Sequence, residues 1–279
     1  DDTESANAIC MLDEVYGTAN RLAIVAWEKR YTRSNNAKMF YSLKDTILVY
    51  RKSEVVSELK EPRTAKSDSI YKNPDNDPRG VWTSASYVNP ATKAKRPNLV
   101  YTILAPDGRE INHPTHAWKH SEESHAQHRR DKLLWWGKNG TAKYPRLKVF
   151  PKKENAGLVP IDVWHHGDTG TTDDGGRELK ELFGSAVFDN PKPTQLLRRA
   201  LGIASDPDSL ILDSFAGSGT TMHAVMQLNR EDGGNRRCIM VEMEEKIATE
   251  VTSERIRRVM QKHAEEDAAS TSRDREGAD

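Results

Sequence analysis

The sequence predicts an α/β fold interrupted by a polar insertion. Continuous apolar runs at Leu22–Trp27 and Thr46–Tyr50 are typical of buried strands, and residues 209–242 read as strand, turn, helix and strand. Between these parts, residues 53–108 are rich in Asn-Pro, Asp-Pro and Pro-Asp-Gly turn signals. A chain of 279 residues is long enough for two domains, or for one large α/β unit with an insertion.

Composition excludes several classes of protein. The chain has 42 Lys and Arg and 42 Asp and Glu, so its formal net charge of zero gives no overall indication of a nucleic-acid or membrane partner. No apolar run reaches about 18 residues and no signal peptide is visible, so we expect neither a transmembrane helix nor export. Cys10 and Cys238 are too few for a disulfide framework or a cysteine-rich zinc module, and they predict a reducing, cytoplasmic compartment.

The elements follow in order from local signals. A helix is predicted near the start, where Ile9, Leu12 and Val15 recur at helical spacing and Gly17 ends it. The later predictions are short strands at Tyr101–Leu104 and Leu133–Trp136, a loop at Gly167–Gly176, a helix at Glu178–Phe183, and a helix that Thr194 caps and that runs to about Ile203. The Glu-, Asp- and Ala-rich tail from about Ala264 is expected to be disordered.

The insertion carries an excess of positive charge. Residues 51–150 contain 19 Lys and Arg against 11 Asp and Glu, whereas residues 201–250 contain 4 against 9. This asymmetry fits a polyanionic partner at one segment, although a solvated surface can have the same composition. The densest group is Lys143, Arg146, Lys148, Lys152 and Lys153, with Tyr144 and Phe150 between them. Such a pattern can neutralise phosphates and stack on bases, so these five cations are the candidate DNA-binding residues.

Five histidines gather beside Trp118, and they do not predict a metal site. They are His113, His116, His120, His125 and His128. Their spacing is irregular and no cysteine is near, whereas a zinc site needs a compact set of ligands. We therefore expect no metal here, and favour histidines that lie at the surface or contact DNA.

The strongest signal for a binding site is the glycine-rich turn that follows the strand at residues 209–213. Asp213 ends the strand, and Gly217 and Gly219 let the backbone approach a ligand closely before a helix begins. The next apolar strand, residues 238–241, leads to Glu242, whose carboxylate can accept hydrogen bonds from both hydroxyls of a ribose. Asp213 would repel a phosphate but attract an ammonium group, so a ligand with a ribose and an amino-acid end, S-adenosylmethionine, fits best.

Two nucleotide-binding alternatives share part of this pattern. A dinucleotide fold would place a third glycine where Met222 stands, and a phosphate loop would carry Lys after the second glycine, where this chain has Thr220-Thr221. An ordinary strand–turn–helix with packing glycines also remains open, but the acids after both strands make it less favoured.

The order of these motifs resembles the β-class amino-methyltransferases of DNA. The resemblance is carried by Pro191-Lys192-Pro193, Leu196-Leu197 and the run from Asp213 to Thr221. Two further runs are similar to the central region of modification subunits of type III restriction–modification systems: Asn73-Pro74-Asp75-Asn76-Asp77-Pro78-Arg79-Gly80-Val81-Trp82 and Trp136-Gly137-Lys138-Asn139-Gly140. Asp13-Glu14-Val15-Tyr16-Gly17 is similar to the stretch that follows the catalytic strand. The similarity covers about residues 1–258.

This resemblance implies a fold, a cofactor and a domain plan. The fold would be a Rossmann-like S-adenosylmethionine-dependent methyltransferase sheet of seven strands, in the permuted β-class order, with an inserted target-recognition region. Residues 1–55 would belong to the catalytic domain, 56–170 to target recognition and 171–262 to the cofactor-binding half, leaving 263–279 as the tail. The cofactor residues would be Lys192, Pro193, Asp213, Phe215, Ala216, Gly217, Ser218, Gly219, Thr220 and Glu242. The implied partners are double-stranded DNA, a restriction subunit and a second copy of the chain.

One departure separates the chain from that family. Its catalytic motif, Asp-Pro-Pro-Tyr, is absent, because no two prolines are adjacent anywhere in the 279 residues. Since the chain opens with Asp1-Asp2-Thr3-Glu4 rather than an initiator, we expect a piece of a longer protein. The sequence therefore predicts a DNA adenine-N6 methyltransferase of the modification type, whose catalytic residues are unknown. The alternatives are a fragment that only binds cofactor or DNA, and a cytosine-N4 methyltransferase.

Overall fold

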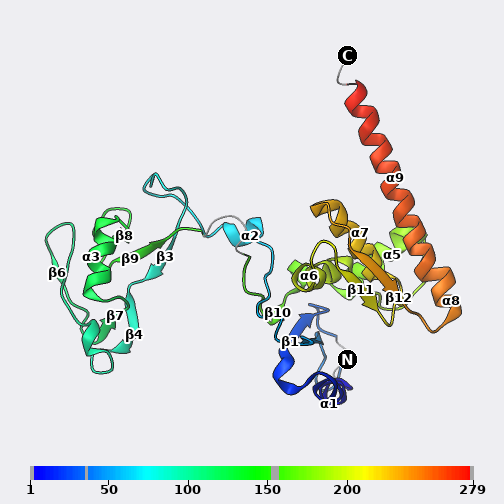
Figure 1. Cartoon of the computed structure of the whole chain (residues 1–279), viewed down its shortest axis with the longest axis horizontal. Coiled ribbons are helices and arrows are strands. Elements are labelled where there is room, and N and C mark those ends of the chain that lie inside the picture. The colour runs from blue at the N-terminus through cyan, green and yellow to red at the C-terminus, as the bar shows by residue number, and fades with distance from the viewer. Residues whose placement is uncertain (1–2, 35–36, 152–156, 277–279) are drawn as a thin grey trace. The chain divides into compact units, whose positions relative to one another are not determined.

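The computed structural model describes residues 3–34, 37–151 and 157–276 and divides into two compact units. The core unit comprises Asp1–Pro62 and Gly157–Asp279, and the inserted unit is Arg63–Ala156 (Figure 1). Each unit has its own cluster of buried apolar residues. In the described ranges no helix is both long and apolar enough to cross a membrane.

The first part of the core unit is a small mixed sheet with a helix before it. Helix α1 (Ser5–Tyr16) ends at Gly17, whose φ of 84° favours glycine, and the 3₁₀ turn η1 (Thr18–Asn20) leads into the sheet. Strand β1 (Arg21–Glu28) pairs antiparallel with β2 (Lys44–Tyr50) and parallel with β10 (Val163–Trp164). The predicted helix and both predicted strands are confirmed, because each depends on a local apolar pattern.

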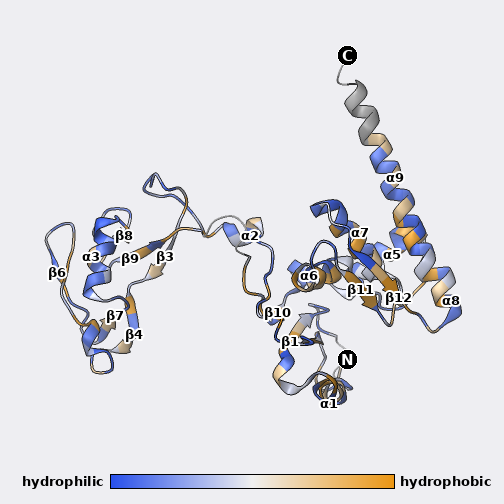
Figure 2. Ribbon diagram, viewed as in Figure 1, coloured by the Kyte–Doolittle hydropathy of each residue, from blue (hydrophilic) through white to orange (hydrophobic). Residues whose placement is uncertain are grey.

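The second part of the core unit contains the parallel pair that carries the glycine-rich turn. Its elements in order are α4 (His166–Thr169), α5 (Thr172–Phe183), α6 (Thr194–Ala204), β11 (Leu210–Asp213), α7 (Thr220–Asp232), β12 (Arg237–Met240), α8 (Glu245–Ile247), the π-helical turn η3 (Ala248–Thr252) and α9 (Ser253–Glu276). Strands β11 and β12 pair in parallel with Leu212 opposite Ile239. Figure 2 shows hydrophobic residues along both strands.

The mixed α/β class is confirmed, but a single seven-stranded sheet is not formed by the described residues. Strands β10, β1 and β2 make one sheet, whereas β11 and β12 make another. Within the described part of the chain the ladder of β11 stops at β12, because no further strand pairs with it. The core between β1 and α6 is nevertheless well defined: Val25, Trp27, Trp164 and Leu196 are buried together.

Two segments are more helical than the sequence predicted. The expected loop Gly167–Gly176 contains α4 and the start of α5, since Thr171 and Asp174 form a reciprocal capping box. Helix α9 extends to Glu276, through residues for which composition indicated disorder. Glu, Arg and Ala also suit a helix, and an ion pair of 2.8 Å between Arg230 and Asp267 ties α9 to α7.

The inserted unit consists of short elements around an aromatic core. They are α2 (Ala65–Asp68), β3 (Thr83–Ser86), β4 (Val88–Thr92), η2 (Pro97–Leu99), β5 (Ile103–Leu104), β6 (Glu110–Ile111), β7 (His116–Trp118), α3 (Glu122–Arg130), β8 (Leu134–Trp135) and β9 (Arg146–Val149). Strands β3, β9 and β8 form one sheet, while β4–β7 and β5–β6 are separate antiparallel pairs. Tyr87, Ile103, Trp118 and Trp136 are buried at the centre.

Candidate functional site

The glycine-rich turn runs from the end of β11 to the start of α7, and its two glycines are required by its shape. Gly217 and Gly219 have φ values of 51° and 75°, in the left-handed region. A Cβ atom on Gly217 would lie 3.2 Å from the Phe188 ring, and one on Gly219 would lie 3.2 Å from the Thr252 carbonyl oxygen. No side chain caps α7, so the first N–H groups of this helix face the turn.

Two carboxylates flank the turn, as the sequence predicted. The backbone N–H of Phe215 donates to Oδ1 of Asp213 at 3.0 Å, and the Thr221 hydroxyl donates to Oδ2. Gly217 donates its N–H to Oε2 of Glu242 at 2.8 Å, and Glu244 donates to Oε1 at 3.1 Å. These backbone donors lower the pKa of Glu242, so it is ionised near neutral pH.

Lys192 connects the turn to the sheet that contains β1. Its carbonyl oxygen accepts from the Thr220 hydroxyl at 3.1 Å, and its ammonium group contacts Asp45 at 2.7 Å and lies 4.9 Å from the centre of the Trp27 ring. Burial opposes ionisation of Asp45, but hydrogen bonds from Lys192 and Lys29 outweigh it and lower the pKa of this carboxyl. Lys192 thus links the start of α7 to strands β1 and β2.

Close packing of α5 fixes the course of the Pro191–Pro193 segment. A Cβ atom on Gly175 would lie 2.2 Å from the Pro191 carbonyl oxygen, so only glycine fits. Pro193 is fully buried, and the helix that follows begins at Thr194. The prediction that Thr194 caps this helix is wrong: Glu178 of α5 accepts from both the N–H and the hydroxyl of Thr194, and so supplies the cap.

The predicted cofactor residues differ in exposure. Phe215 is 91% exposed, whereas Ala216, Ser218 and Thr220 are buried. The hydroxyls of Ser218 and Thr220 are 3.0 Å apart, so these two buried side chains support the turn from within.

The sequence did not predict three residues that support the turn and its surroundings: Glu178, Thr252 and Arg255. The Thr252 hydroxyl donates to the Gly217 carbonyl oxygen at 2.7 Å, and Arg255 donates to the Thr220 hydroxyl at 2.8 Å. They lie on α5, η3 and α9, far from the glycines in the chain. No sequence motif marks them, since their role depends on how these elements pack against α7.

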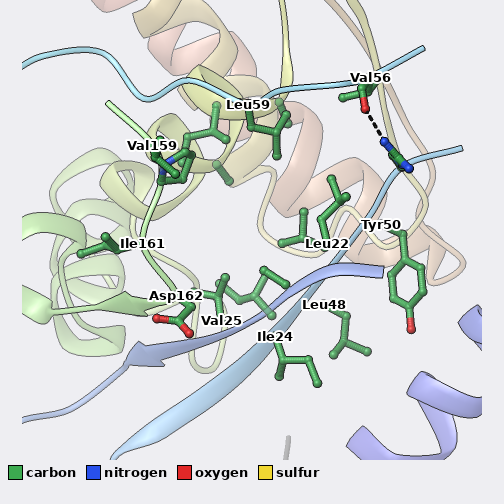
Figure 3. Close-up of a pocket in the computed structure, with 18 of the residues that line it drawn as sticks. Leu22, Ile24, Val25, Leu48, Tyr50, Val56, Leu59, Val159, Ile161 and Asp162 are labelled. Atoms are coloured by element: carbon green, nitrogen blue, oxygen red, sulfur yellow. Dashed lines mark hydrogen bonds between the residues drawn. The ribbon is translucent and has the colours of Figure 1, made fainter. Parts of the chain in front are cut away.

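A large apolar cavity of about 830 Å³ lies in the core unit but away from the turn. It is lined by strands β1 and β2, by residues 56–59 and 159–162, and by α6; Figure 3 shows Ile24, Leu48, Leu59 and Val159 around it. The Arg51 guanidinium donates to the Val56 carbonyl oxygen at one end, at 2.9 Å. No predicted cofactor residue lines it, so we do not assign the cofactor to this cavity.

The five candidate DNA-binding cations have different environments. The Lys143 ammonium lies 5.4 Å from the centre of the Tyr144 ring, and the exposed Arg146 donates to the Ser84 hydroxyl at 2.7 Å. Lys148 is instead only 7% exposed and paired with Asp75 and Asp77, so its charge is neutralised inside the unit. The remaining two, Lys152 and Lys153, lie outside the described residues.

Part of the histidine cluster is buried instead of lying at the surface. His125 is 6% exposed, and its Nδ1 lies 3.1 Å from the Tyr87 hydroxyl, which also lies 3.0 Å from Nδ1 of His128. Burial lowers the pKa of His125 to about 4, so the ring is neutral at physiological pH. Among the described residues no three His, Cys, Asp or Glu side chains form a candidate metal site.

Comparison with known proteins identifies similar sequences along most of the chain. A protein family described as DNA methylase matches residues 1–253. The type III restriction-modification enzyme StyLTI Mod subunit of Salmonella typhimurium is 32% identical over 94% of this chain and 41% of its own length. The EcoPI Mod subunit of Escherichia phage P1 is 28% identical over 88% and 42%, and the type II methyltransferase M.KpnI of Klebsiella pneumoniae is 26% identical over 87% and 60%. The chain thus spans about half the length of these relatives.

Proposed function

We propose a function from one established premise: the chain belongs to the DNA methylase family. It forms part of a site-specific DNA methyltransferase that transfers a methyl group from S-adenosylmethionine to adenine N6. The core unit binds the cofactor, and the protein is the modification component of a restriction–modification system. The relatives named Mod subunit support the assignment to a modification component, since the similarity to them covers most of this chain.

The arrangement around the glycine-rich turn is the observation that carries this proposal. Each carboxylate oxygen of Glu242 accepts one backbone N–H and has lone pairs left for ribose hydroxyls. Asp213 places a second carboxylate at the end of β11, where an ammonium group is favoured over a phosphate. The chemistry of these groups therefore fits S-adenosylmethionine, which supplies an activated methyl group when bound. Lys192, Pro193 and the residues from Phe215 to Thr220 shape this site.

The inserted unit is the part that we assign to DNA. Lys143 and Arg146 are the described members of the basic group that remain candidates for phosphate contacts, and Lys152 and Lys153 stay in the proposal from sequence. A restriction subunit and a second copy of the chain are the further partners that we propose. The two free cysteines agree with a reducing compartment such as the cytoplasm.

A second candidate function follows from the missing catalytic motif. Because the 279 residues contain no adjacent prolines, they hold no Asp-Pro-Pro-Tyr, and this chain by itself could act as a binding module. Cytosine N4 is the alternative target, since the absent motif is the one that would distinguish the two amines.

A methyl-transfer assay separates these functions. The chain is incubated with DNA and S-adenosylmethionine labelled in its methyl group, and the DNA is digested and analysed for modified nucleosides. Label in N6-methyladenine supports the main proposal, and label in N4-methylcytosine supports the other target. Cofactor binding without any transfer identifies a binding module, whereas a folded chain that binds neither cofactor nor DNA contradicts both functions.

A further inference from the structure

Arg255 is a fully buried cation directly beneath the glycine-rich turn. Its side chain is 0% exposed, although it comes from α9, the long C-terminal helix. Nη1 donates to the Thr220 hydroxyl at 2.8 Å and to the Ser218 hydroxyl at 3.2 Å, and lies 3.4 Å from the Ser218 carbonyl oxygen. One guanidinium nitrogen therefore contacts both ends of the Ser218–Thr220 segment.

The other side of the same guanidinium contacts α5 and α7. Nη2 lies 3.5 Å from Oε2 of Glu178, and this carboxylate accepts from the backbone N–H and the hydroxyl of Thr194. Arg255 and Glu178 thus link the glycine-rich turn to the start of α6, directly after Pro193. The two segments that we assign to the cofactor are joined from below by one buried ion pair.

The Arg255 guanidinium also contacts His223 of α7, and the His223 ring in turn lies beside Gln227 of the same helix. Nε and Nη2 lie 3.3 and 3.2 Å from Nδ1 of His223, and because a guanidinium has only donors, Nδ1 accepts and Nε2 carries the proton. Burial holds the pKa of His223 low, at about 3, and keeps it neutral. The side-chain nitrogen of Gln227 lies 3.2 Å from Nε2, and the Gln227 Oε1 has no hydrogen-bond partner among the described residues. We expect this oxygen to face the Nε2 proton.

A contribution to folding stability does not by itself explain why a charged side chain is buried at position 255. Removing a cation from water is energetically unfavourable, and a buried ion pair often stabilises the fold no more than apolar packing would. Burial lowers the pKa of Arg255 to about 10, against the opposing effect of Glu178, so the side chain stays protonated at neutral pH. What an apolar residue cannot supply is a set of donors that hold two hydroxyls and a carbonyl group in one arrangement.

We infer that Arg255 is a positioning residue, which holds the Gly217–Thr220 backbone in the shape that binds the cofactor. It contacts no ligand itself; it acts through Ser218 and Thr220, and Glu178 extends the same restraint to Thr194. The part of this inference that concerns affinity rests on the proposed function, whereas the part that concerns the shape of the turn does not.

Arginine substitutions at two buried sites test this inference. Arg255→Lys and Arg255→Met are compared with Arg236→Lys and Arg236→Met in the 279-residue chain. Arg236 is a matched control, since its side chain is 4% exposed and ion-paired to Asp232 at 2.8 Å, near the start of β12 and away from the turn. Three quantities are measured for each protein: the melting temperature, hydrogen exchange of the peptide covering residues 214–221, and affinity for S-adenosylmethionine.

We expect both Arg255 variants to speed exchange at residues 214–221 and to weaken cofactor binding by about tenfold or more, because lysine has one ammonium where arginine has a fork of donors. The Arg236 variants lower the melting temperature but change neither exchange at the turn nor affinity.

Unchanged exchange in a folded Arg255→Lys protein, or affinity that follows melting temperature equally at both sites, overturns the inference. If the wild type binds no cofactor, the proposed function fails, and the exchange comparison still decides whether Arg255 holds the turn. Arg255→Lys keeps the comparison decisive if Arg255→Met does not fold.

Discussion

At the scale of single residues, Gly219 is constrained both by its backbone conformation and by a close neighbour. Its backbone is left-handed, and Thr252 of η3 occupies the space where a side chain would begin. Gly233, at the end of α7, has a similar φ of 70° but nothing within 4 Å of its Cβ position. A comparison of Gly219 with Gly233 therefore distinguishes the cost of the left-handed backbone, which both share, from the cost of close packing, which only Gly219 has.

Gly219→Ala is expected to cost more than Gly233→Ala. A left-handed alanine costs about 1–2 kcal/mol at either site, and only residue 219 adds a collision with Thr252. We expect chemical denaturation to show a larger loss of unfolding free energy for Gly219→Ala, and calorimetry to show weaker cofactor binding for that variant alone. Equal losses and equal affinities would argue against the close approach at Gly219.

The buried His125 predicts loss of stability in mild acid. Its folded pKa of about 4 lies below the unfolded value of about 6.5, so the unfolded chain takes up the proton first. The free energy of unfolding therefore falls as pH decreases from about 6.5 to 4, by about 1–3 kcal/mol. His120 and His128 contribute in the same direction, because burial lowers their pKa values as well.

Thermal melts of wild type and His125→Gln between pH 4 and 7 check this effect. The variant removes one titrating group, so its melting temperature should depend less on pH across this window. A variant whose pH dependence is as steep as that of the wild type would contradict a buried neutral imidazole.

At the scale of elements, the sequence was informative where structure depends on neighbouring residues. The strands β1, β2 and β11 were predicted close to their observed bounds, and a helix was predicted after the glycine-rich turn, where α7 lies. The start of α5 was predicted wrongly as a loop. Gly175 lies inside the helix, where the absence of a side chain lets the Pro191–Pro193 backbone pack closely against it. The cap of α6 comes from Glu178, sixteen residues away, and the support of the turn comes from Arg255, so neither could be read from local spacing.

Strand β9 contains a predicted DNA-contact residue, Lys148, whose environment also depends on residues that are distant in the sequence. Lys148 lies in a basic run, yet it pairs with Asp75 and Asp77, more than seventy residues earlier. Its ammonium also lies 5.2 Å from the centre of the Trp82 ring. Only the folded unit reveals that this lysine is internal, whereas Lys143 remains at the surface.

Lys148→Met is expected to affect stability and Lys143→Met to affect DNA binding. Removing Lys148 leaves two aspartates without their shared cation, so the melting temperature of the inserted unit should fall by about 5 °C or more. Removing Lys143 should leave the melting temperature unchanged and weaken DNA binding, most clearly at low salt. Calorimetry and DNA titrations at two salt concentrations measure both quantities. Weaker DNA binding by a folded, equally stable Lys148→Met protein would restore that residue to the DNA contacts.

At the scale of the whole molecule, the chain consists of two units with separate cores. Trp118 and Trp136 lie in the core of the inserted unit, whereas Trp27 and Trp164 lie in that of the core unit. Glu61 and Leu158, which belong to the core unit and lie on either side of the insertion in the sequence, form an isolated antiparallel β-bridge. An independently folding insertion is the expected consequence.

The peptide Arg63–Ala156 should therefore fold alone. We expect it to show cooperative thermal unfolding and protected amides in the peptides that contain Tyr87 and Trp118, because those side chains are buried within the unit. Circular dichroism and hydrogen exchange of the isolated peptide make this comparison with the full chain. A peptide without a melting transition would mean that the core unit is needed to hold the insertion together.

The most direct test of the account is a calorimetric titration of S-adenosylmethionine into the chain, with Asp213→Ala, Glu242→Ala and Lys143→Met beside the wild type. The glycine-rich turn is the centre of the proposed function, and these two carboxylates flank it. We predict that the wild type and Lys143→Met bind equally, and that each acidic variant loses about 1–3 kcal/mol of binding free energy. A folded wild type that does not bind the cofactor, or acidic variants that bind as tightly as the wild type, would contradict the assignment of the cofactor to this turn.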